Sequence, residues 1–228
     1  MDSLTARGLA AMFDHTLLNA NACLADFERV AAECREYHFS AMAVNSAVAG
    51  LCKKLLEGSG VLVAATVSFP LGQMTLKSKL FETEDAIGNG AGEIDYVINI
   101  SELKNGNWDY LEKEMSAIAG LCREHNVISK VIFETCYLTK DEIVTLSGIA
   151  RQVRPDFIKT STGFGPGGAA AENVALMKQS AGENVKIKAS GGIRDLKQCL
   201  AMIDAGAQRI GCSASVKILN EFTALNGN

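Results

Sequence analysis

Two lysines lie in short segments that otherwise look like buried strands. Lys159 sits in "DFIKTST" and Lys188 in "VKIKAS", and each is followed closely by small residues and a glycine turn. Lysine is almost never fully buried unless a partner balances its charge. A third ionisable residue, Asp95, lies in the apolar segment "EIDYVINI". Two interior lysines with an aspartate nearby are suited to amine catalysis on a carbonyl compound.

The alternation of side chains indicates which way these residues point. Successive residues of a strand face opposite sides of a sheet. The more apolar, β-branched residues of the three segments fall on one parity, whereas Lys159, Lys188 and Asp95 fall on the other. If the apolar set packs against helices, the ionisable residues point into a barrel interior, where they must pair with one another or take part in chemistry.

An interior lysine acts as a nucleophile only when it is uncharged. With an ordinary pKa of about 10.4, about one lysine in 2,500 is neutral at pH 7. Burial and a second cation nearby both lower the pKa of a lysine. We therefore expect Lys159 to be the nucleophile and Lys188 to supply the neighbouring positive charge. Asp95 is expected to keep Lys188 protonated and to relay protons with it.

A lysine in a strand is more commonly a rim residue, whose stem packs while its ammonium group stays in water. Lys130 and Lys186 lie near the starts of their predicted strands, and we interpret both as rim residues at the bottom of the barrel. Lys159 and Lys188 differ, because they lie near the carboxyl ends of neighbouring strands, where barrel enzymes have their active sites.

Glycine-rich turns follow the last three predicted strands. They are "TGFGPGG", "SGGIRD" and "GCSAS". Backbone N–H groups at the start of a helix bind an anion well, and glycine lets the anion approach closely. These turns predict a phosphate site around Gly163, Gly191, Gly192, Gly211 and Ser213.

These residues need a scaffold that brings the strand ends together. Apolar strand-like segments alternate with amphipathic helical segments along the chain. Strands are predicted at residues 11–18, 40–46, 61–69, 93–100, 128–136, 156–162, 185–190 and 208–213, and helices at 25–38, 47–57, 76–89, 108–124, 140–153, 169–180, 194–204 and 214–222. Eight such pairs within 228 residues predict an α/β protein, a TIM (β/α)8 barrel with a single domain over residues 1–228. A doubly wound open sheet would show the same alternation, but no G-x-G-x-x-G follows the first strand.

The composition excludes several classes of function. Hydrophobic residues make up 48% and charged residues 21% of the chain, close to the averages of globular proteins. The net charge of −4 gives no basic field for nucleic acid or an anionic membrane. The seven cysteines are scattered without a C-x-x-C pair, which argues against structural zinc and for free thiols in a reducing compartment. Since neither a signal peptide nor a membrane span is recognised, we expect a cytoplasmic protein with no nucleic-acid or membrane partner.

Seven segments, taken in order, resemble the deoxyribose-phosphate aldolases, a family of class I aldolases. They are "DHTLLN", "TVSFPLG", "GAGEIDYVINI", "KVIFETCYLT", "FIKTSTGFGPGGA", "VKIKASGGIRD" and "RIGCSAS". The resemblance runs from about Asp14 to Ser213, nearly the whole chain. It implies reversible cleavage of 2-deoxy-D-ribose 5-phosphate to acetaldehyde and D-glyceraldehyde 3-phosphate on a TIM barrel, with no cofactor and no metal.

The resemblance also implies roles for individual residues. Lys159 matches the family's Schiff-base lysine, and Lys188 and Asp95 match its proton-transfer residues. Asp14 and Thr16 match positions that line the sugar site, and the glycine turns fall where the family holds the substrate phosphate. Family members are often dimers, so a homo-oligomer is implied.

The chain departs from the family pattern in its second predicted strand and toward its end. Ala43 and Ser46 stand where many members have cysteine and proline, which we expect to alter the pocket wall. No tyrosine follows Tyr137, whereas many members carry a later one that reaches the active site. We therefore expect enamine protonation to be slower here or to use another group.

Two rival functions stay open at this point. One is a class I aldolase with altered phosphorylated-substrate specificity, and the other is a phosphate-binding barrel without lyase activity. Glu134, at the end of the fifth predicted strand, fits either catalysis or support of the charged residues.

Overall fold

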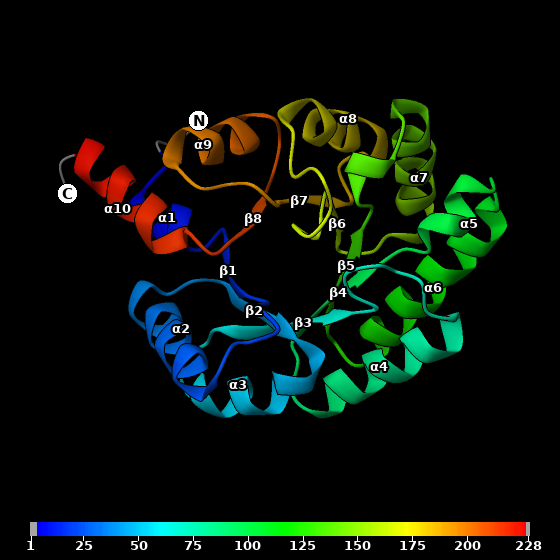
Figure 1. The fold of residues 1–228 in the computed structure, drawn as a ribbon. Coiled ribbons are helices and arrows are strands. Elements are labelled where there is room, and N and C mark those ends of the chain that lie inside the picture. Colours follow the sequence, from blue (N-terminus) through cyan, green and yellow to red (C-terminus); the bar gives the residue numbers. More distant parts are fainter. Residues whose placement is uncertain (1–3, 227–228) are drawn as a thin grey trace.

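Eight parallel strands form a closed barrel at the centre of the structure (Figure 1). The computed structural model describes residues 4–226, and its strands pair in sequence order, with β8 returning to β1. The strands are β1 (Phe13–Leu17), β2 (Ala41–Asn45), β3 (Leu62–Val67), β4 (Glu93–Val97), β5 (Ile128–Ile132), β6 (Phe157–Lys159), β7 (Lys186–Ser190) and β8 (Arg209–Cys212). The predicted (β/α)8 barrel is confirmed, and the open sheet is excluded because it would leave two strand edges unpaired.

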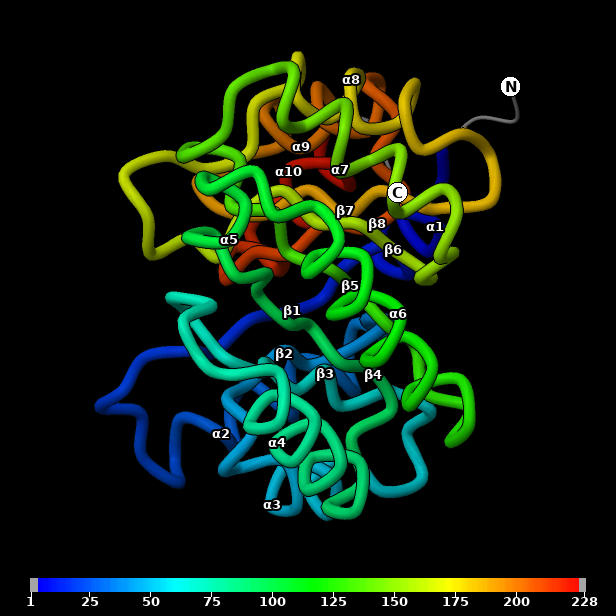
Figure 2. Tube along the Cα trace, turned by 90° about the vertical axis from the view of Figure 1, so that its right-hand side faces the viewer, coloured from blue at the N-terminus to red at the C-terminus, as the bar shows by residue number. Residues whose placement is uncertain are grey.

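Helices surround the barrel (Figures 1 and 2). Those that follow the strands in turn are α2 (Leu24–Tyr37), α3 (Ala49–Leu55), α4 (Leu76–Gly88), α6 (Trp108–Glu124), α7 (Lys140–Val153), α8 (Ala171–Ala181), α9 (Leu196–Asp204) and α10 (Ser215–Asn226). Three shorter pieces lie outside the predicted helices, since they are too short to show a helical period: α1 (Ala6–Ala10), α5 (Ile100–Lys104) and the 3₁₀ turn Thr135–Tyr137. A second 3₁₀ turn, Ser46–Val48, overlaps the start of the helix predicted at residues 47–57. Across residues 4–226, no helix has both the length and the apolar character needed to cross a membrane.

Side chains fix where helices begin, and hence where the loops of the barrel mouth end. Thr139 and Glu142 form a reciprocal capping box at α7, with hydrogen bonds of 3.2 and 2.7 Å. At α2, the carboxylate of Asp26 accepts a hydrogen bond from the backbone N–H of Cys23 at 2.9 Å. This helix therefore begins at Leu24, one residue before the predicted start.

The predicted alternation of the strands is confirmed. Outward residues such as Ile94 and Ile158 are fully buried in the layer between strands and helices. On β2 and β3 a separate interior cluster contains the small residues Ala41, Ala43 and Ala64. Small side chains on this side of a barrel leave interior space for long side chains from the facing strands.

Candidate active site

A cavity of about 260 Å³ opens at the carboxyl ends of the strands. Its wall comes from the ends of β1, β6, β7 and β8, from the loops after them, and from Ala43 of β2. The residues predicted from the sequence that line it are Thr16, Lys159, Gly163, Gly191, Gly192, Gly211 and Ser213. The structure thus brings the predicted nucleophile and the predicted phosphate turns to one cavity.

Lys159 ends β6 and reaches this cavity with a side chain that is almost fully buried. Its relative exposure is 3%, and its Nζ donates a hydrogen bond to Oδ2 of Asp95 at 2.7 Å. Lys188 Nζ donates to the same oxygen at 2.6 Å. Strand pairing aligns Lys159 directly with Lys188, so one carboxylate oxygen holds both amines. The three residues selected by strand parity therefore meet in the structure.

The surroundings of Lys159 favour the neutral amine. Burial lowers the pKa of Lys159 to about 8 despite the opposing effect of Asp95, and the positive charges of Lys188 and Lys130 act in the same direction as burial. With a pKa of 8, about one amine in ten is neutral at pH 7, compared with about one in 2,500 for an ordinary lysine. Imine formation requires a lowered lysine pKa of this kind, because only the neutral amine attacks the carbonyl carbon.

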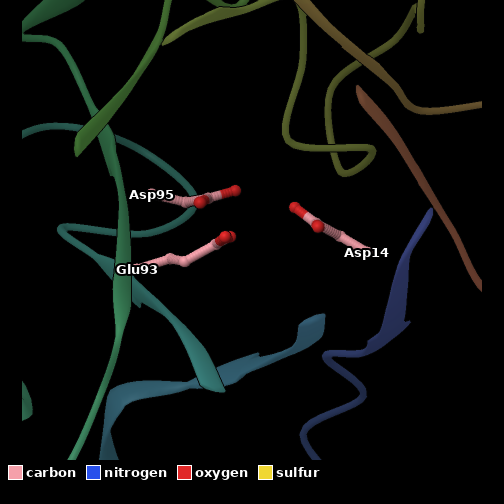
Figure 3. A group of neighbouring side chains, drawn as sticks. All are labelled: Asp14, Glu93 and Asp95. Atoms are coloured by element: carbon pink, nitrogen blue, oxygen red, sulfur yellow. The ribbon is translucent and has the colours of Figure 1, made fainter. Parts of the chain in front are cut away.

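Three carboxylates face one another inside the barrel, and two of them, Asp14 and Asp95, contact the lysines. Figure 3 shows Asp14 reaching from β1 toward Glu93 and Asp95, which both come from β4. Each has an oxygen within 4.8 Å of an oxygen of the other two. Carboxylates this close repel one another strongly in a low-dielectric interior unless cations lie between them.

Lys130 supplies the central cation. Its Nζ lies 2.5 Å from Oδ1 of Asp95 and 3.6 Å from Oδ2 of Asp14, and it also forms an ion pair with Glu93. The prediction that Lys130 is a rim residue is wrong, because its side chain is fully buried. Its ammonium group thus lies among the three carboxylates. Lys186, interpreted in the same way, is exposed as predicted.

Arg209 and Asp14 complete this interior group. Arg209 Nη1 donates hydrogen bonds to Oδ1 of Asp14 at 2.5 Å and to Oε1 of Glu93 at 3.1 Å, and Asp14 Oδ2 accepts a hydrogen bond from Lys188. Asp14, which the resemblance places at the sugar site, is fully buried and is not among the residues that line the cavity. Its contacts are with Lys188 and Arg209.

The buried charges of this group are unequal in number. They are the carboxylates of Asp14, Glu93 and Asp95 and the cations of Lys130, Lys159, Lys188 and Arg209. If every member is ionised, this group carries one positive charge more than it has negative charges, which is costly away from water. Burial opposes the charged forms of Lys130 and Arg209, but their carboxylate partners raise both pKa values. Deprotonating Lys159 is therefore the least costly way to balance the charges.

The glycine turns come close together at the other side of the cavity. Gly191 has a φ of +87°, and a Cβ there would lie 3.1 Å from Cα of Gly168 and 3.2 Å from Cβ of Ser161. Such a conformation and such close packing favour glycine. Arg194, which was not predicted, also lines this cavity and is exposed. Its position within "SGGIRD", directly after the glycine pair, is the sequence signal that could have identified it.

Glu134 supports the loop that carries Gly163. Its buried carboxylate accepts hydrogen bonds from both the backbone N–H and the hydroxyl of Thr162. Thr162 Oγ1 in turn accepts a hydrogen bond from the backbone N–H of Phe164 at 3.0 Å. These contacts give Glu134 a structural role. The sequence alone left open whether its role is structural or catalytic.

The two departures in the second strand have different positions. Ala43 lines the cavity, as expected of a wall residue. Ser46 instead donates a hydrogen bond to Oε1 of Glu82 at 2.8 Å, and Oε2 of Glu82 accepts one from the N–H of Ser68 at 2.8 Å. Ser46 thereby ties its 3₁₀ turn to α4 and to the loop after β3.

Comparisons with known proteins agree on one family. The model of the family described as DeoC/LacD family aldolase matches residues 9–221. The chain is 52% identical over 214 residues to the deoxyribose-phosphate aldolase of Lactobacillus acidophilus, with 94% of this chain and 90% of that protein covered. It is 47% identical over 223 residues to the enzyme of the same name from Bacteroides thetaiotaomicron, covering 98% and 94%.

Solved structures give the same result. The aldolase QR15 is 35% identical and superposes with a TM-score of 0.90, covering 96% of this chain and 97% of that chain. The tetrameric deoxyribose phosphate aldolase of Aeropyrum pernix is 30% identical and superposes with a TM-score of 0.87, covering 97% and 93%.

Proposed function

The chain belongs to the DeoC/LacD family of aldolases, and we propose that Lys159 is the residue that forms its Schiff base. The enzyme is a deoxyribose-phosphate aldolase, an aldehyde-lyase that reversibly cleaves 2-deoxy-D-ribose 5-phosphate to acetaldehyde and D-glyceraldehyde 3-phosphate. The observation that carries the proposal is the buried Nζ of Lys159 at the cavity, hydrogen-bonded to Asp95 and adjacent to Lys188.

The first half of the reaction uses the neutral amine. Lys159 Nζ adds to C1 of the open-chain sugar, and loss of water from the carbinolamine gives a protonated imine. The C2–C3 bond then breaks, because acetaldehyde retains C1 and C2. Its electron pair moves toward the iminium nitrogen and forms an enamine, while the proton of the C3 hydroxyl is removed and C3 becomes the aldehyde of glyceraldehyde 3-phosphate.

Asp95 and Lys188 are the groups placed to move these protons. Asp95 Oδ2 contacts both amines, so a proton taken up by this pair stays next to the imine nitrogen. The pair, with an ordered water, accepts the C3 hydroxyl proton and returns a proton to the enamine carbon. Hydrolysis of the resulting iminium releases acetaldehyde and restores the Lys159 amine.

The phosphate end of the substrate fits the opposite side of the cavity. Gly163, Gly191, Gly192, Gly211 and Ser213 line it, and backbone N–H groups next to helix starts bind anions without a net positive charge. Arg194 lies at the same wall and adds a guanidinium group suited to phosphate. Thr16 of β1 also lines the cavity and is placed to contact the sugar.

A second activity, cleavage of another phosphorylated aldol by the same chemistry, is favoured by one observation. Ala43 leaves room in the cavity wall. Turnover of a panel of phosphorylated aldehydes and ketoses, compared with deoxyribose 5-phosphate, separates the two substrate ranges.

Trapping with borohydride tests the proposed nucleophile. Reduction in the presence of deoxyribose 5-phosphate should leave a stable adduct that peptide mass mapping places on Lys159, and EDTA should not diminish it. Lys159→Leu should abolish both adduct and turnover. Lys186→Leu, which removes an exposed lysine from the adjacent strand, is the matched control and should retain both. Turnover that persists in Lys159→Leu would refute the assignment.

We further propose that the enzyme is a cytoplasmic homodimer of one barrel domain over residues 1–228. The seven cysteines, all within the described residues, are free thiols, as expected in a reducing compartment. The Aeropyrum pernix enzyme is a tetramer, which supports self-association in the family.

A further inference from the structure

An ion pair is fully buried outside the barrel, between two neighbouring helices. The side chains of Lys79 on α4 and Glu114 on α6 have no exposed surface, and Lys79 Nζ lies 2.7 Å from Oε1 of Glu114. The two helices lie side by side next to β4 (Figure 1). Neither residue lines the active-site cavity. The pair therefore needs an explanation other than direct contact with the substrate.

Burial makes this ion pair costly. It lowers the pKa of Lys79 and raises the pKa of Glu114, so it opposes the charged form of both. Apolar residues of similar volume in place of a buried ion pair often leave a protein equally stable or make it more stable. Other buried side chains of α6, such as Leu111, Met115 and Ile118, are apolar. Stability alone thus does not account for two charged residues in this layer.

Both side chains also bind the backbone at the carboxyl end of β4. Lys79 Nζ donates a hydrogen bond to the carbonyl oxygen of Val97 at 2.7 Å, and Oε2 of Glu114 accepts one from the backbone N–H of Asn99 at 3.0 Å. The pairing of β4 with β3 ends at Tyr96, so the two side chains act where this ladder stops. An ammonium group and a carboxylate satisfy a carbonyl and an N–H together, which two apolar side chains cannot do.

The backbone held in this way belongs to the strand that carries Asp95. Val97 lies two residues after Asp95 on β4. Oδ2 of Asp95 must contact two amines at once, since it lies 2.7 Å from Lys159 Nζ and 2.6 Å from Lys188 Nζ. A displacement of about 1 Å at a catalytic group can slow a reaction about 100-fold. The position of the end of β4 therefore matters for the reaction.

We propose that Lys79 and Glu114 are positioning residues, which hold the end of β4 so that Asp95 contacts both lysines of the site. They act through the backbone of β4 and touch neither the substrate nor the reacting atoms. The inference rests on the proposed function, because it takes Asp95 to be a proton-transfer residue there. It places two determinants of the reaction in the helical layer, outside the barrel.

A double substitution separates positioning from stability. Lys79→Met with Glu114→Met removes both charges and both backbone hydrogen bonds but keeps side chains of similar length. Its urea midpoint should stay close to that of wild type, while kcat for deoxyribose 5-phosphate should fall about tenfold or more. KM should change less than about twofold, because the phosphate turns follow β6, β7 and β8. A crystal structure of the variant should show Asp95 out of hydrogen-bond distance of Lys159 or Lys188.

Met115→Ala is the matched control. Met115 is the next residue along α6 and is fully buried, so its truncation should lower the urea midpoint by leaving a cavity and should not change kcat. If the double Met variant does not fold, Lys79→Met with Glu114→Gln takes its place. That change removes both charges and the hydrogen bond to Val97, but the amide oxygen can still accept from Asn99, so kcat should fall by a smaller factor.

The other outcomes separate this inference from the proposed function. An unchanged kcat in the folded double variant, or a loss confined to KM, overturns the positioning role, and so does an Asp95 that still contacts both lysines. An equal loss of kcat in Met115→Ala overturns it too, because any disturbance of α6 would then suffice. Borohydride trapping of acetaldehyde on Lys159 should continue in every variant. Its absence in wild type would instead contradict the Schiff base itself.

Discussion

Lys159 and Lys188 share one oxygen of Asp95, so the charge state of each lysine affects the other. Burial is the largest reason for the low pKa of Lys159, and the charge of Lys188 adds to it. Asp95 acts in the opposite direction, but it also anchors Lys188. The nucleophile thus remains hydrogen-bonded in a defined position while its proton is made easy to lose.

The first prediction at the residue scale concerns the pH dependence of imine formation. Because only the neutral amine reacts, the trapping rate with acetaldehyde should rise with pH and level off above a midpoint near the pKa of Lys159, about 8. Lys188→Met removes a neighbouring positive charge, so the protonated form becomes more favourable and the midpoint should move to higher pH. The single-turnover rate of borohydride trapping measures this without requiring the later proton transfers.

Removing an interior negative charge should have the opposite effect. Glu93→Gln increases the surplus positive charge of the interior, so the midpoint should move to lower pH. Glu93 does not line the cavity, and a merely structural role would slow trapping at every pH without moving the midpoint. Lys186→Met is the matched control with no expected shift. Midpoints that move the same way in the Lys188 and Glu93 variants would contradict the charge argument.

At the scale of elements, the approach of β7 to β8 depends on a residue without a side chain. Gly211 of β8 pairs with Ser190 of β7. A Cβ at Gly211 would lie 3.0 Å from Cε of Lys188 and 3.0 Å from Cβ of Ser190. The small residue therefore leaves the space through which the Lys188 side chain reaches Asp14 and Asp95.

Gly211→Ala should displace Lys188 and lower kcat by about tenfold or more, since misplaced catalytic groups lose much of their effect. Steady-state kinetics with deoxyribose 5-phosphate measures the loss. Gly120→Ala in α6 is a suitable control because nothing lies within 4 Å of the added Cβ. That change should leave kcat unaltered and stabilise the fold by about 0.5–1 kcal/mol. Unchanged kcat in Gly211→Ala would show that the Lys188 side chain does not depend on the space beside Gly211 to reach Asp14 and Asp95.

For the molecule as a whole, a charged group replaces part of the apolar packing usual inside a TIM barrel. Lys130 contacts all three interior carboxylates, and it belongs to β5 while they belong to β1 and β4. The ion pairs therefore connect β5 both to its neighbour β4 and to β1, which is distant in the sequence. Removing one member leaves opposite charges buried without a partner.

Lys130→Met should lower the free energy of unfolding by about 3–5 kcal/mol, the usual cost of breaking a buried ion pair. Urea denaturation followed by circular dichroism measures it. Lys130→Met combined with Glu93→Gln removes one charge of each sign and should lose less than Lys130→Met alone. A double variant as unstable as the single one would show that the loss comes from packing and not from uncompensated charge.

The amino-acid sequence by itself determined the order of strands and helices, the barrel and the inward direction of Lys159, Lys188 and Asp95, because the alternation of a strand is a local property. It also indicated the glycine turns, whose residues are consecutive in the chain. The depth of each inward side chain was decided only by the tertiary structure, since depth depends on how neighbouring strands are staggered in a closed barrel. The register of β4 with β5 sets Lys130 beside Asp95, which is why a residue that resembles a rim lysine in the sequence lies at the centre of the interior charges. The contacts of Asp14 and Glu93 with Arg209 likewise join strands far apart in the chain, so only closure of the barrel reveals the surplus positive charge that favours a neutral Lys159.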